Sequence, residues 1–184
     1  RSGADKVAIN TGAIANPQLI TDGSRAFGSQ CIVLYIEAIR RGPGKYECLT
    51  DNARQQTGLD VFDWVRKAVE LGAGEILLTS VDQEGTGRGY DIELTAAVSQ
   101  MVDVPVIASG GAGTPEHVKQ VIQEGRADAV CAASLFHYGY VEEMSALNAK
   151  FEEGNIEFLK KELPIPSLGR RGITATSIPE LKSF

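Results

Sequence analysis

The chain has 184 residues, 43% of them hydrophobic and 23% charged, which is enough for one domain with a sizeable core. Its net charge of −6 argues against a general nucleic-acid binder, and no apolar run is long enough to span a membrane. Three widely spaced cysteines without a CxxC pair favour a reducing cytoplasm. With only two histidines we expect no histidine-rich metal site, and we also expect no organic cofactor. Because the chain enters a strand-like run without an initiator methionine, we interpret it as a fragment.

Short apolar runs alternate with amphipathic stretches along the chain, a pattern typical of βα units around a parallel sheet. The predicted strands cover residues 6–10, 31–36, 75–79, 105–109 and 129–133, with a small hairpin arm at 45–49. Helices are predicted at 16–27, 61–71, 92–101, from 115 onward and at 141–151, with Asp60 and Thr114 as N-caps. Five parallel strands fit an open doubly wound sheet, part of an eight-fold barrel, or a half-barrel that dimerises.

An internal similarity links the two ends of this pattern. Residues 3–11 resemble residues 126–134, because each is an apolar strand that follows an Ala-Asp pair and ends in a small hydroxyl residue. A repeat of this kind suggests two related halves, although chance similarity of two strands would look the same.

The carboxyl ends of the predicted strands are polar and rich in glycine. Residues 79–91 follow one strand, 109–113 follow the next, and Ala133-Ser134 ends the last. Glycine lets backbone N–H groups approach an anion closely, and barrel enzymes place their sites at this end. Any one loop could be only a tight turn, but together we interpret them as a phosphate cup. By the internal similarity, Asn10-Thr11 is a second anion site, unless the two residues merely cap a helix.

Three charged residues stand at the ends of predicted strands. Glu37 follows residues 31–36 and is expected to point at the barrel mouth, where a carboxylate can act as a general acid or base. Lys6 and Glu75 start their strands, so they belong to the opposite face, where charges could pair around the barrel bottom. The alternative for all three is ordinary solvated surface charge.

Six segments of the chain carry a family resemblance. In order they are Gly-Ala-Asp-Lys-Val-Ala-Ile-Asn-Thr, Phe-Gly-Ser-Gln-Cys, Gly-Ala-Gly-Glu-Ile-Leu-Leu-Thr-Ser, Asp-Gln-Glu-Gly-Thr-Gly-Arg-Gly-Tyr-Asp, Ile-Ala-Ser-Gly-Gly-Ala-Gly and Ala-Ala-Ser-Leu-Phe-His. Over residues 2–140 they resemble the cyclase subunit of imidazole glycerol phosphate synthase. The sister isomerase of the pathway shares the barrel and its phosphate loops, but Leu-Leu-Thr-Ser and Gly-Tyr-Asp look like the cyclase.

The resemblance implies a fold and a reaction. The fold is an α/β (βα)8 TIM barrel of two similar halves, here a partial barrel with strands four to eight over residues 1–151, followed by an atypical tail at 152–184. A glutaminase subunit, bound as a heterodimer at the N-terminal barrel face, supplies ammonia through the barrel. The ammonia reacts with phosphoribulosyl-formimino aminoimidazole carboxamide ribonucleotide, which carries two phosphates. The products are imidazole glycerol phosphate and aminoimidazole carboxamide ribonucleotide, in a cytoplasmic lyase of histidine biosynthesis with no nucleic-acid or membrane partner.

The resemblance also assigns residues. One phosphate site takes Asn10 and Thr11, and Thr79 and Ser109 line the pocket. Lys6 and Glu75 ring the ammonia entrance, with Asp5 on the same face. The second phosphate site takes Gly85, Gly110, Gly111, Ala133 and Ser134.

The sequence departs from the family at its catalytic positions. The family uses aspartates on the first and fifth strands; the first strand is not in this chain, and Ile-Asp-Ala-Lys-Arg is here Ile-Glu-Ala-Ile-Arg, with Glu37 and Ile39. Glutamate moves the carboxylate by one methylene, and a displacement near an ångström can cost on the order of a hundredfold in rate. Glu84 stands where the family usually has aspartate, and the glycine loop of the third strand is missing.

These departures lead to two expectations and two alternative functions. We expect the fragment alone to be inactive and, because of its open sheet edges, to aggregate or to pair with a copy of itself. One alternative is a cyclase-like partner that hands ammonia to a sugar during surface-glycan synthesis, for which Glu37 and Ile39 would suit a changed substrate. The other is a degenerate barrel that only binds phosphate ligands or the glutaminase.

Overall fold

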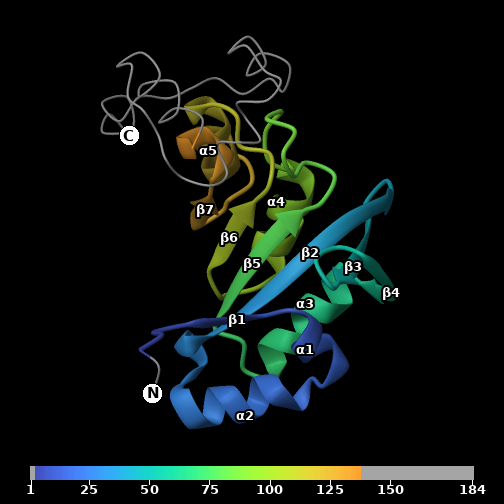
Figure 1. The fold of residues 1–184 in the computed structure, drawn as a ribbon, viewed down its shortest axis with the longest axis vertical. Helices are drawn as coiled ribbons and strands as arrows, with labels where there is room; N and C mark the ends of the chain where they lie inside the picture. Colours follow the sequence, from blue (N-terminus) through green and yellow to red (C-terminus); the bar gives the residue numbers. More distant parts are fainter. Residues whose placement is uncertain (1–2, 138–184) are drawn as a thin grey trace, which may run out of the picture.

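A curved sheet forms the centre of residues 3–137, the part of the chain that the computed structural model describes (Figure 1). Its strands are β1 (Val7–Ile9), β2 (Ile32–Gly42), β3 (Lys45–Thr50), β4 (Gln55–Asp60), β5 (Glu75–Ser80), β6 (Val106–Ser109) and β7 (Ala129–Cys131). The helices are α1 (Thr11–Ala15), α2 (Gln18–Phe27), a 3-10 turn η1 (Ser29–Cys31), α3 (Val61–Glu70), α4 (Ile92–Met101) and α5 (Pro115–Gln123). The predicted α/β class is confirmed.

Five strands run parallel, as the sequence predicted, and their order in the sheet is β1-β2-β5-β6-β7. β2 is longer than its neighbours and changes partner along one edge. Its first three residues pair with β1, and from Glu37 onward it pairs with the antiparallel strand β3, which in turn pairs with β4. The parallel strands are consistent with part of a (βα)8 barrel, and β3 and β4 form a hairpin extension beyond it.

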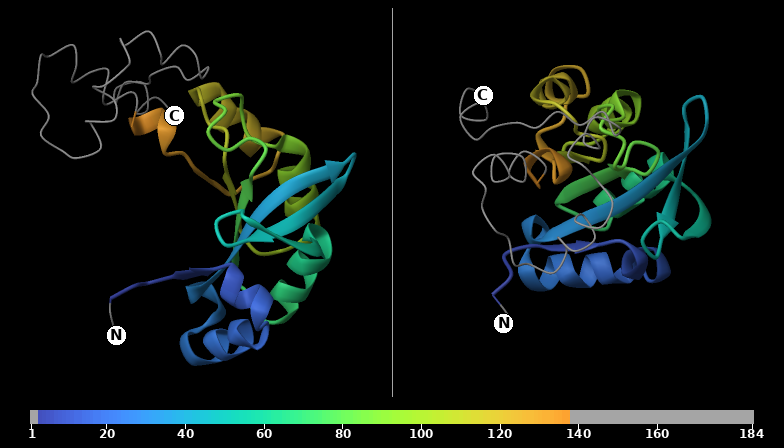
Figure 2. Two further views of the ribbon diagram at one scale, coloured as in Figure 1. Left: turned by 45° about the vertical axis from the view of Figure 1, so that its right-hand side comes forward. Right: turned by 45° about the horizontal axis from the view of Figure 1, so that its top comes forward.

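The two faces of the sheet differ because side chains alternate along each strand. On β2, Ile32, Leu34 and Ile36 are buried in one apolar core with Trp64 of α3 and Ile20 of α2. Figure 2 shows the helices along this outer side of the curved sheet. Tyr35 and Glu37, which are one position out of phase with these core residues, therefore lie on the opposite face, away from the helices.

The local signals for helix starts are largely confirmed. Asp60 caps α3, since its side chain accepts hydrogen bonds from the backbone N–H groups of Phe62 (2.8 Å) and Asp63 (3.1 Å). Thr114 is the N-cap of α5 with Pro115 at the first position, but its side chain makes no capping hydrogen bond. The predicted helix at residues 16–27 is wrong at its start, because helical structure begins at Thr11 and is divided into α1 and α2 at Pro17.

Two features of the hairpin correct the sequence prediction. Glu37 does not end its strand, because β2 continues to Gly42 through the antiparallel pairing with β3. β4 was not predicted, since its residues are polar and show no apolar alternation; it is held by pairing with β3, and the Thr57 hydroxyl donates to the Cys48 carbonyl (2.6 Å). The predicted helix at 141–151 and the tail at 152–184 lie outside the described residues.

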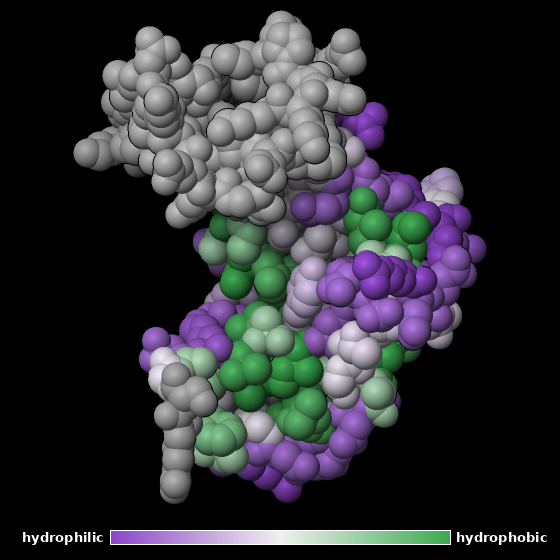
Figure 3. Space-filling view, in the orientation of Figure 1, coloured by the Kyte–Doolittle hydropathy of each residue, from purple (hydrophilic) through white to green (hydrophobic). Residues whose placement is uncertain are grey.

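Apolar side chains also reach the surface. Figure 3 shows a patch of them over β1 and the start of β2, and Val7 of β1 is 50% exposed. Whether the chain pairs with a copy of itself through such a surface stays a prediction. Within residues 3–137, no helix combines the length and the apolar character needed to cross a membrane.

Candidate active site

Four residues at the carboxyl ends of the parallel strands lie in one row across the sheet. Glu37 pairs with Thr79, Thr79 with Ser109, and Ser109 with Cys131. Neighbouring strands in a sheet lie about 5 Å apart, and side chains at one level of the pleat point to the same face. The row therefore places a carboxylate, two hydroxyls and a thiol side by side on the face without helices.

A pocket of about 350 Å³ opens over the first part of this row, and we call it the carboxylate pocket. Glu37 is only 7% exposed, while Glu84 at its rim is exposed. The lining residues are Tyr35, Glu37, Asn52, Ala53, Thr79, Val81, Glu84 and Ser109.

Both oxygens of the Glu37 carboxylate accept hydrogen bonds. Oε2 accepts from Asn10 Nδ2 (2.9 Å) and from the backbone N–H of Ala53 (3.0 Å), and Oε1 accepts from the Tyr35 hydroxyl (3.3 Å). A buried carboxylate is stable only when such donors replace water. The three donors come from the end of β1, from the turn between β3 and β4, and from β2 itself, so Glu37 is fixed by several parts of the fold.

The donor from Ala53 depends on an unusual turn. Asp51, Asn52 and Ala53 have φ values of 54°, 55° and 59°, so three consecutive residues with side chains adopt the left-handed conformation. That conformation costs about 1–2 kcal/mol for a residue with a Cβ atom, although aspartate and asparagine tolerate it better than alanine. The turn thus holds local strain beside the carboxylate pocket, and it aims one backbone N–H at Glu37.

A second cavity, of about 90 Å³, adjoins the first, and we call it the glycine cup. Glu84 and Ser109 border both cavities. The lining residues are Glu84, Gly85, Gly87, Ser109, Gly110, Gly111, Ala112, Cys131, Ala132, Ala133 and Ser134.

Backbone contact between two loops shapes the glycine cup. The N–H of Gly89 donates to the Gly111 carbonyl (2.8 Å), and Gly111 has a φ of 101°. A Cβ atom at position 111 would clash with the Gly89 carbonyl, so only glycine allows the two loops to approach this closely. Glycine-rich loops at strand ends are typical of sites where backbone N–H groups bind an anion.

Tyr90 fixes the end of β7 beside the cup. Its hydroxyl donates to the Cys131 carbonyl (3.1 Å). Burial raises the pKa of Tyr90 to about 12, and the nearby Cys131 acts in the same direction. The hydroxyl therefore keeps its proton and remains a donor throughout the neutral range.

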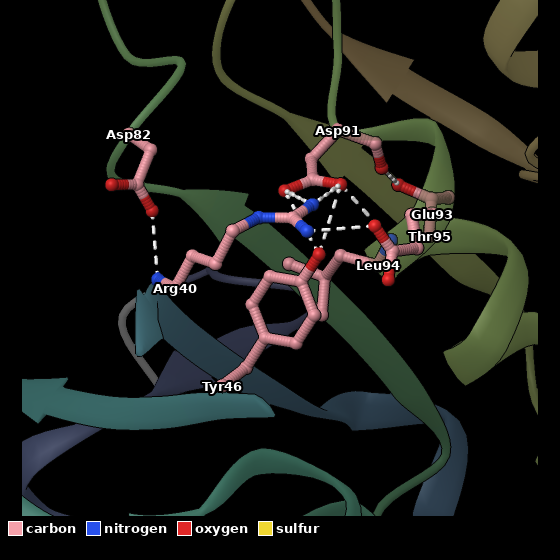
Figure 4. Close-up of polar contacts among 7 residues, drawn as sticks. All are labelled: Arg40, Tyr46, Asp82, Asp91, Glu93, Leu94 and Thr95. Carbon is pink, nitrogen blue, oxygen red and sulfur yellow. Dashed lines mark hydrogen bonds and ion pairs between the residues drawn. The ribbon is translucent and has the colours of Figure 1, made fainter. Parts of the chain in front are cut away.

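A charged network holds both ends of the loop between β5 and α4 (Figure 4). The backbone N–H of Arg40 donates to Asp82 (2.8 Å), and the Arg40 guanidinium binds Asp91 (3.2 Å) and Glu93 (2.7 Å). The guanidinium lies 4.8 Å from the centre of the Tyr46 ring. Because Asp82 and Asp91 flank the glycine segment, Arg40 ties that segment to the end of β2.

The pKa values of Arg40 and Tyr46 are both raised in this network. The hydrogen bond from Arg40 to Glu93 is the largest influence on the pKa of Arg40 and raises it; burial lowers it, Asp91 raises it further, and the net shift is upward. Burial, together with the charge of Asp91, raises the pKa of Tyr46. The guanidinium therefore stays charged, and the Tyr46 hydroxyl stays a donor to Asp91 (3.3 Å).

Comparison with known proteins places these features in a family. A family model described as "Histidine biosynthesis protein" matches residues 1–142. The chain belongs to the histidine biosynthesis protein family. A curated relative, imidazole glycerol phosphate synthase subunit HisF of Alkaliphilus metalliredigens (strain QYMF), is 52% identical over 141 residues. That match covers 77% of this chain and 56% of the relative, so the chain spans little more than half the length of that protein.

The site residues predicted for this member of the histidine biosynthesis family gather in two groups. Glu37, Thr79 and Ser109 line the carboxylate pocket, whereas Gly85, Gly110, Gly111, Ala133 and Ser134 line the glycine cup. Their binding roles stay predictions, although the structure brings each group together around one cavity.

Asn10 and Thr11, predicted as a phosphate site, hydrogen-bond with neighbouring segments of the protein. Both Nδ2 hydrogens of Asn10 are used, by Glu37 (2.9 Å) and by the Leu49 carbonyl (3.1 Å). The Thr11 hydroxyl accepts from the backbone N–H of Asp51 (3.1 Å). In this arrangement their side chains support the Glu37 pocket and the left-handed turn, and their role in binding a phosphate stays a prediction.

Lys6 and Glu75 form an ion pair at the opposite ends of their strands from the site. Lys6 precedes β1 and Glu75 begins β5, and 48% of the Lys6 side chain is exposed. Asp5, the third charge predicted for this face, is also exposed. The pairing of charges around the sheet bottom is therefore present, and its use as an ammonia entrance stays a prediction.

Sequence reasoning missed several residues of the site, among them Tyr35, Cys131 and Ala53. Tyr35 carried a usable signal, because it stands two positions before Glu37 and so shares its face of the strand. Cys131 could have been predicted by comparing strand ends, because it ends β7 and pairs with Ser109 at the end of β6. Ala53 carried no signal, since alanine rarely adopts a positive φ. Among the described residues no cluster of three or more histidine, cysteine or acidic side chains could hold a metal ion.

Proposed function

We propose that this chain carries the cyclase site of an imidazole glycerol phosphate synthase, in which Glu37 is a general acid or base and the glycine cup binds one phosphate of the substrate. The observation that carries the proposal is the row from Glu37 to Cys131, which sets a buried carboxylate directly beside a glycine-lined cavity. The family and the 52% identical relative support the same reaction.

The proposed roles follow from the chemistry of each group. Backbone N–H groups around Gly110 and Gly111 would hold the phosphate, so that the rest of the substrate extends over Thr79 and Ser109. The Glu37 carboxylate would then exchange a proton with the reacting part of the substrate. A second phosphate of phosphoribulosyl-formimino aminoimidazole carboxamide ribonucleotide would bind near Asn10 and Thr11, at the other side of Glu37.

The proposed nitrogen source is ammonia from a glutaminase subunit. The relative is named as a subunit of a synthase, which supports a partner protein. The Lys6–Glu75 pair lies at the ends of β1 and β5 remote from Glu37, so a partner bound there could deliver ammonia along the sheet interior to the site. This lyase activity requires no metal or organic cofactor in the proposal.

Turnover tests the proposal. The complete natural protein is supplied with the bisphosphate substrate and ammonium, and formation of imidazole glycerol phosphate is followed. The Glu37→Gln variant should lose at least about 100-fold in kcat, the lower range for loss of a general acid or base. Glu124→Gln makes the same chemical change at the exposed C-terminal end of α5 and should leave the rate unchanged.

Two outcomes would contradict the proposal. Equal turnover by the parent protein and Glu37→Gln would remove Glu37 from the chemistry. Tight binding of the substrate without any turnover would instead favour a barrel that only binds phosphate ligands.

A further inference from the structure

We propose that Tyr35 is a positioning residue for Glu37, whose hydroxyl fixes the carboxylate so that Oε1 faces the pocket while Oε2 stays bound to the protein. Only the expected effect of Tyr35 on turnover rests on the proposed function. The contact between the two side chains is a separate claim with its own test.

The distribution of donors over the carboxylate supports this role. Oε2 accepts two N–H groups, from Asn10 (2.9 Å) and Ala53 (3.0 Å), which leaves it little capacity for a substrate proton. Oε1 accepts only the Tyr35 hydroxyl (3.3 Å) among the described residues. Tyr35 and Glu37 both line the carboxylate pocket, so we assign Oε1, the oxygen with fewer donors, to the substrate.

The position of Tyr35 on the strand explains why its hydroxyl can reach. Tyr35 and Glu37 point to the same face of β2 and their Cα atoms lie about 7 Å apart along the strand. The glutamate side chain has one methylene more than aspartate and can extend toward the phenol while Oε2 keeps its contact with Ala53. Because its carboxylate lies one methylene closer to the strand, we expect an aspartate at position 37 to lose the contact with Tyr35 that the glutamate makes.

Tyr35 is also suited to remain a donor. Burial raises its pKa, and the negative charges of Glu37 and Glu84 act in the same direction against a hydrogen bond with Thr79. The phenol therefore stays protonated through the neutral range. It can orient Oε1 without giving up its own proton.

A titration tests the contact independently of turnover. Fluorotyrosine is placed at position 35 of the complete natural protein, and its ionisation is followed by fluorine NMR. We expect the Glu37→Gln variant to shift the midpoint of this titration to lower pH, because the neighbouring negative charge is gone, whereas the Glu124→Gln control leaves it in place. An unchanged midpoint in Glu37→Gln would overturn the proposed contact.

A double-mutant cycle on turnover tests the positioning role. Tyr35→Phe should lower kcat on the order of 10-fold to 100-fold with little change in KM, as expected for loss of a hydrogen bond to a charged group that matters in the transition state. In the Glu37→Asp background the same change should have an effect of less than about twofold, because the contact is already lost. Thr21→Val removes a hydroxyl that donates to the Leu71 carbonyl (3.1 Å), away from the site, and should leave kcat unchanged.

The outcomes separate the inference from the proposed function. Equal effects of Tyr35→Phe in both backgrounds would mean a general structural role and would overturn the inference. If Glu37→Gln abolishes turnover while Tyr35→Phe does not affect it, the proposed function stands and the inference fails. If Glu37→Gln has normal turnover, the proposed function fails, and the fluorine titration alone decides whether Tyr35 holds Glu37.

Discussion

Replacing Gly111 by alanine tests whether the close approach of two loops shapes the glycine cup. At this position φ is 101°, and a Cβ atom would clash with the Gly89 carbonyl oxygen. The positive φ costs an alanine about 1–2 kcal/mol, and forcing the backbones apart adds about 1–3 kcal/mol. We therefore expect Gly111→Ala to lower the free energy of unfolding by about 2–5 kcal/mol and to weaken binding of inorganic phosphate.

Gly44 provides a matched control for Gly111→Ala. Its φ is 64°, and an added Cβ would meet no atom within 4 Å. Gly44→Ala therefore carries only the backbone cost, about 1 kcal/mol once the lower entropy of the unfolded chain is included. Urea denaturation and a phosphate titration compare the two variants. Equal unfolding free energies, with phosphate binding intact in both, would refute the role of the loop contact.

Two further predictions concern the left-handed turn and the buried thiol. Ala53→Gly should keep the free energy of unfolding within about 1 kcal/mol of the parent in urea denaturation, because relief of backbone strain offsets the higher entropy of the unfolded chain. Ala53→Pro should lower it by more than about 2 kcal/mol, since proline cannot adopt the observed φ of 59° and lacks the N–H that binds Glu37. Equal unfolding midpoints for the two variants would contradict this. Burial raises the pKa of the Cys48 thiol from 9.0 to about 12, so the unfolded chain loses this proton first and stability should fall as pH rises from 9.0 toward 12, with a slope of up to about 1.4 kcal/mol per pH unit. Cys48→Ala should remove that part of the slope, and an unchanged slope would count against the burial argument.

The sequence was most informative where local chemistry decides the structure. The end of β5 in Thr79-Ser80 and the start of α3 at Asp60 could be predicted, because a short apolar run and a capping carboxylate act within a few residues. The glycine segments were also recognisable, since the spacing of glycine after each strand is a local signal.

Long-range pairing decided what the sequence could not reveal. β2 continues past Ala38, where its pairing with β5 ends, because β3 folds back on it, and the polar strand β4 pairs with the other edge of β3. The left-handed conformation of Ala53 is likewise imposed by the surrounding hairpin, against the preference of alanine. The donors that fix Glu37 come from three separate segments, so its environment could not be read from residues 31–40 alone.

The central claim is that the carboxylate pocket and the glycine cup form one site for one elongated bisphosphate. The most direct measurement is a titration of the complete natural protein with phosphoribulosyl-formimino aminoimidazole carboxamide ribonucleotide, followed through the backbone amide signals of Ala53, Gly110 and Gly111. The account predicts that all three signals shift along one binding curve with a single Kd. Shifts confined to Gly110 and Gly111, or separate curves for the two cavities, would contradict it.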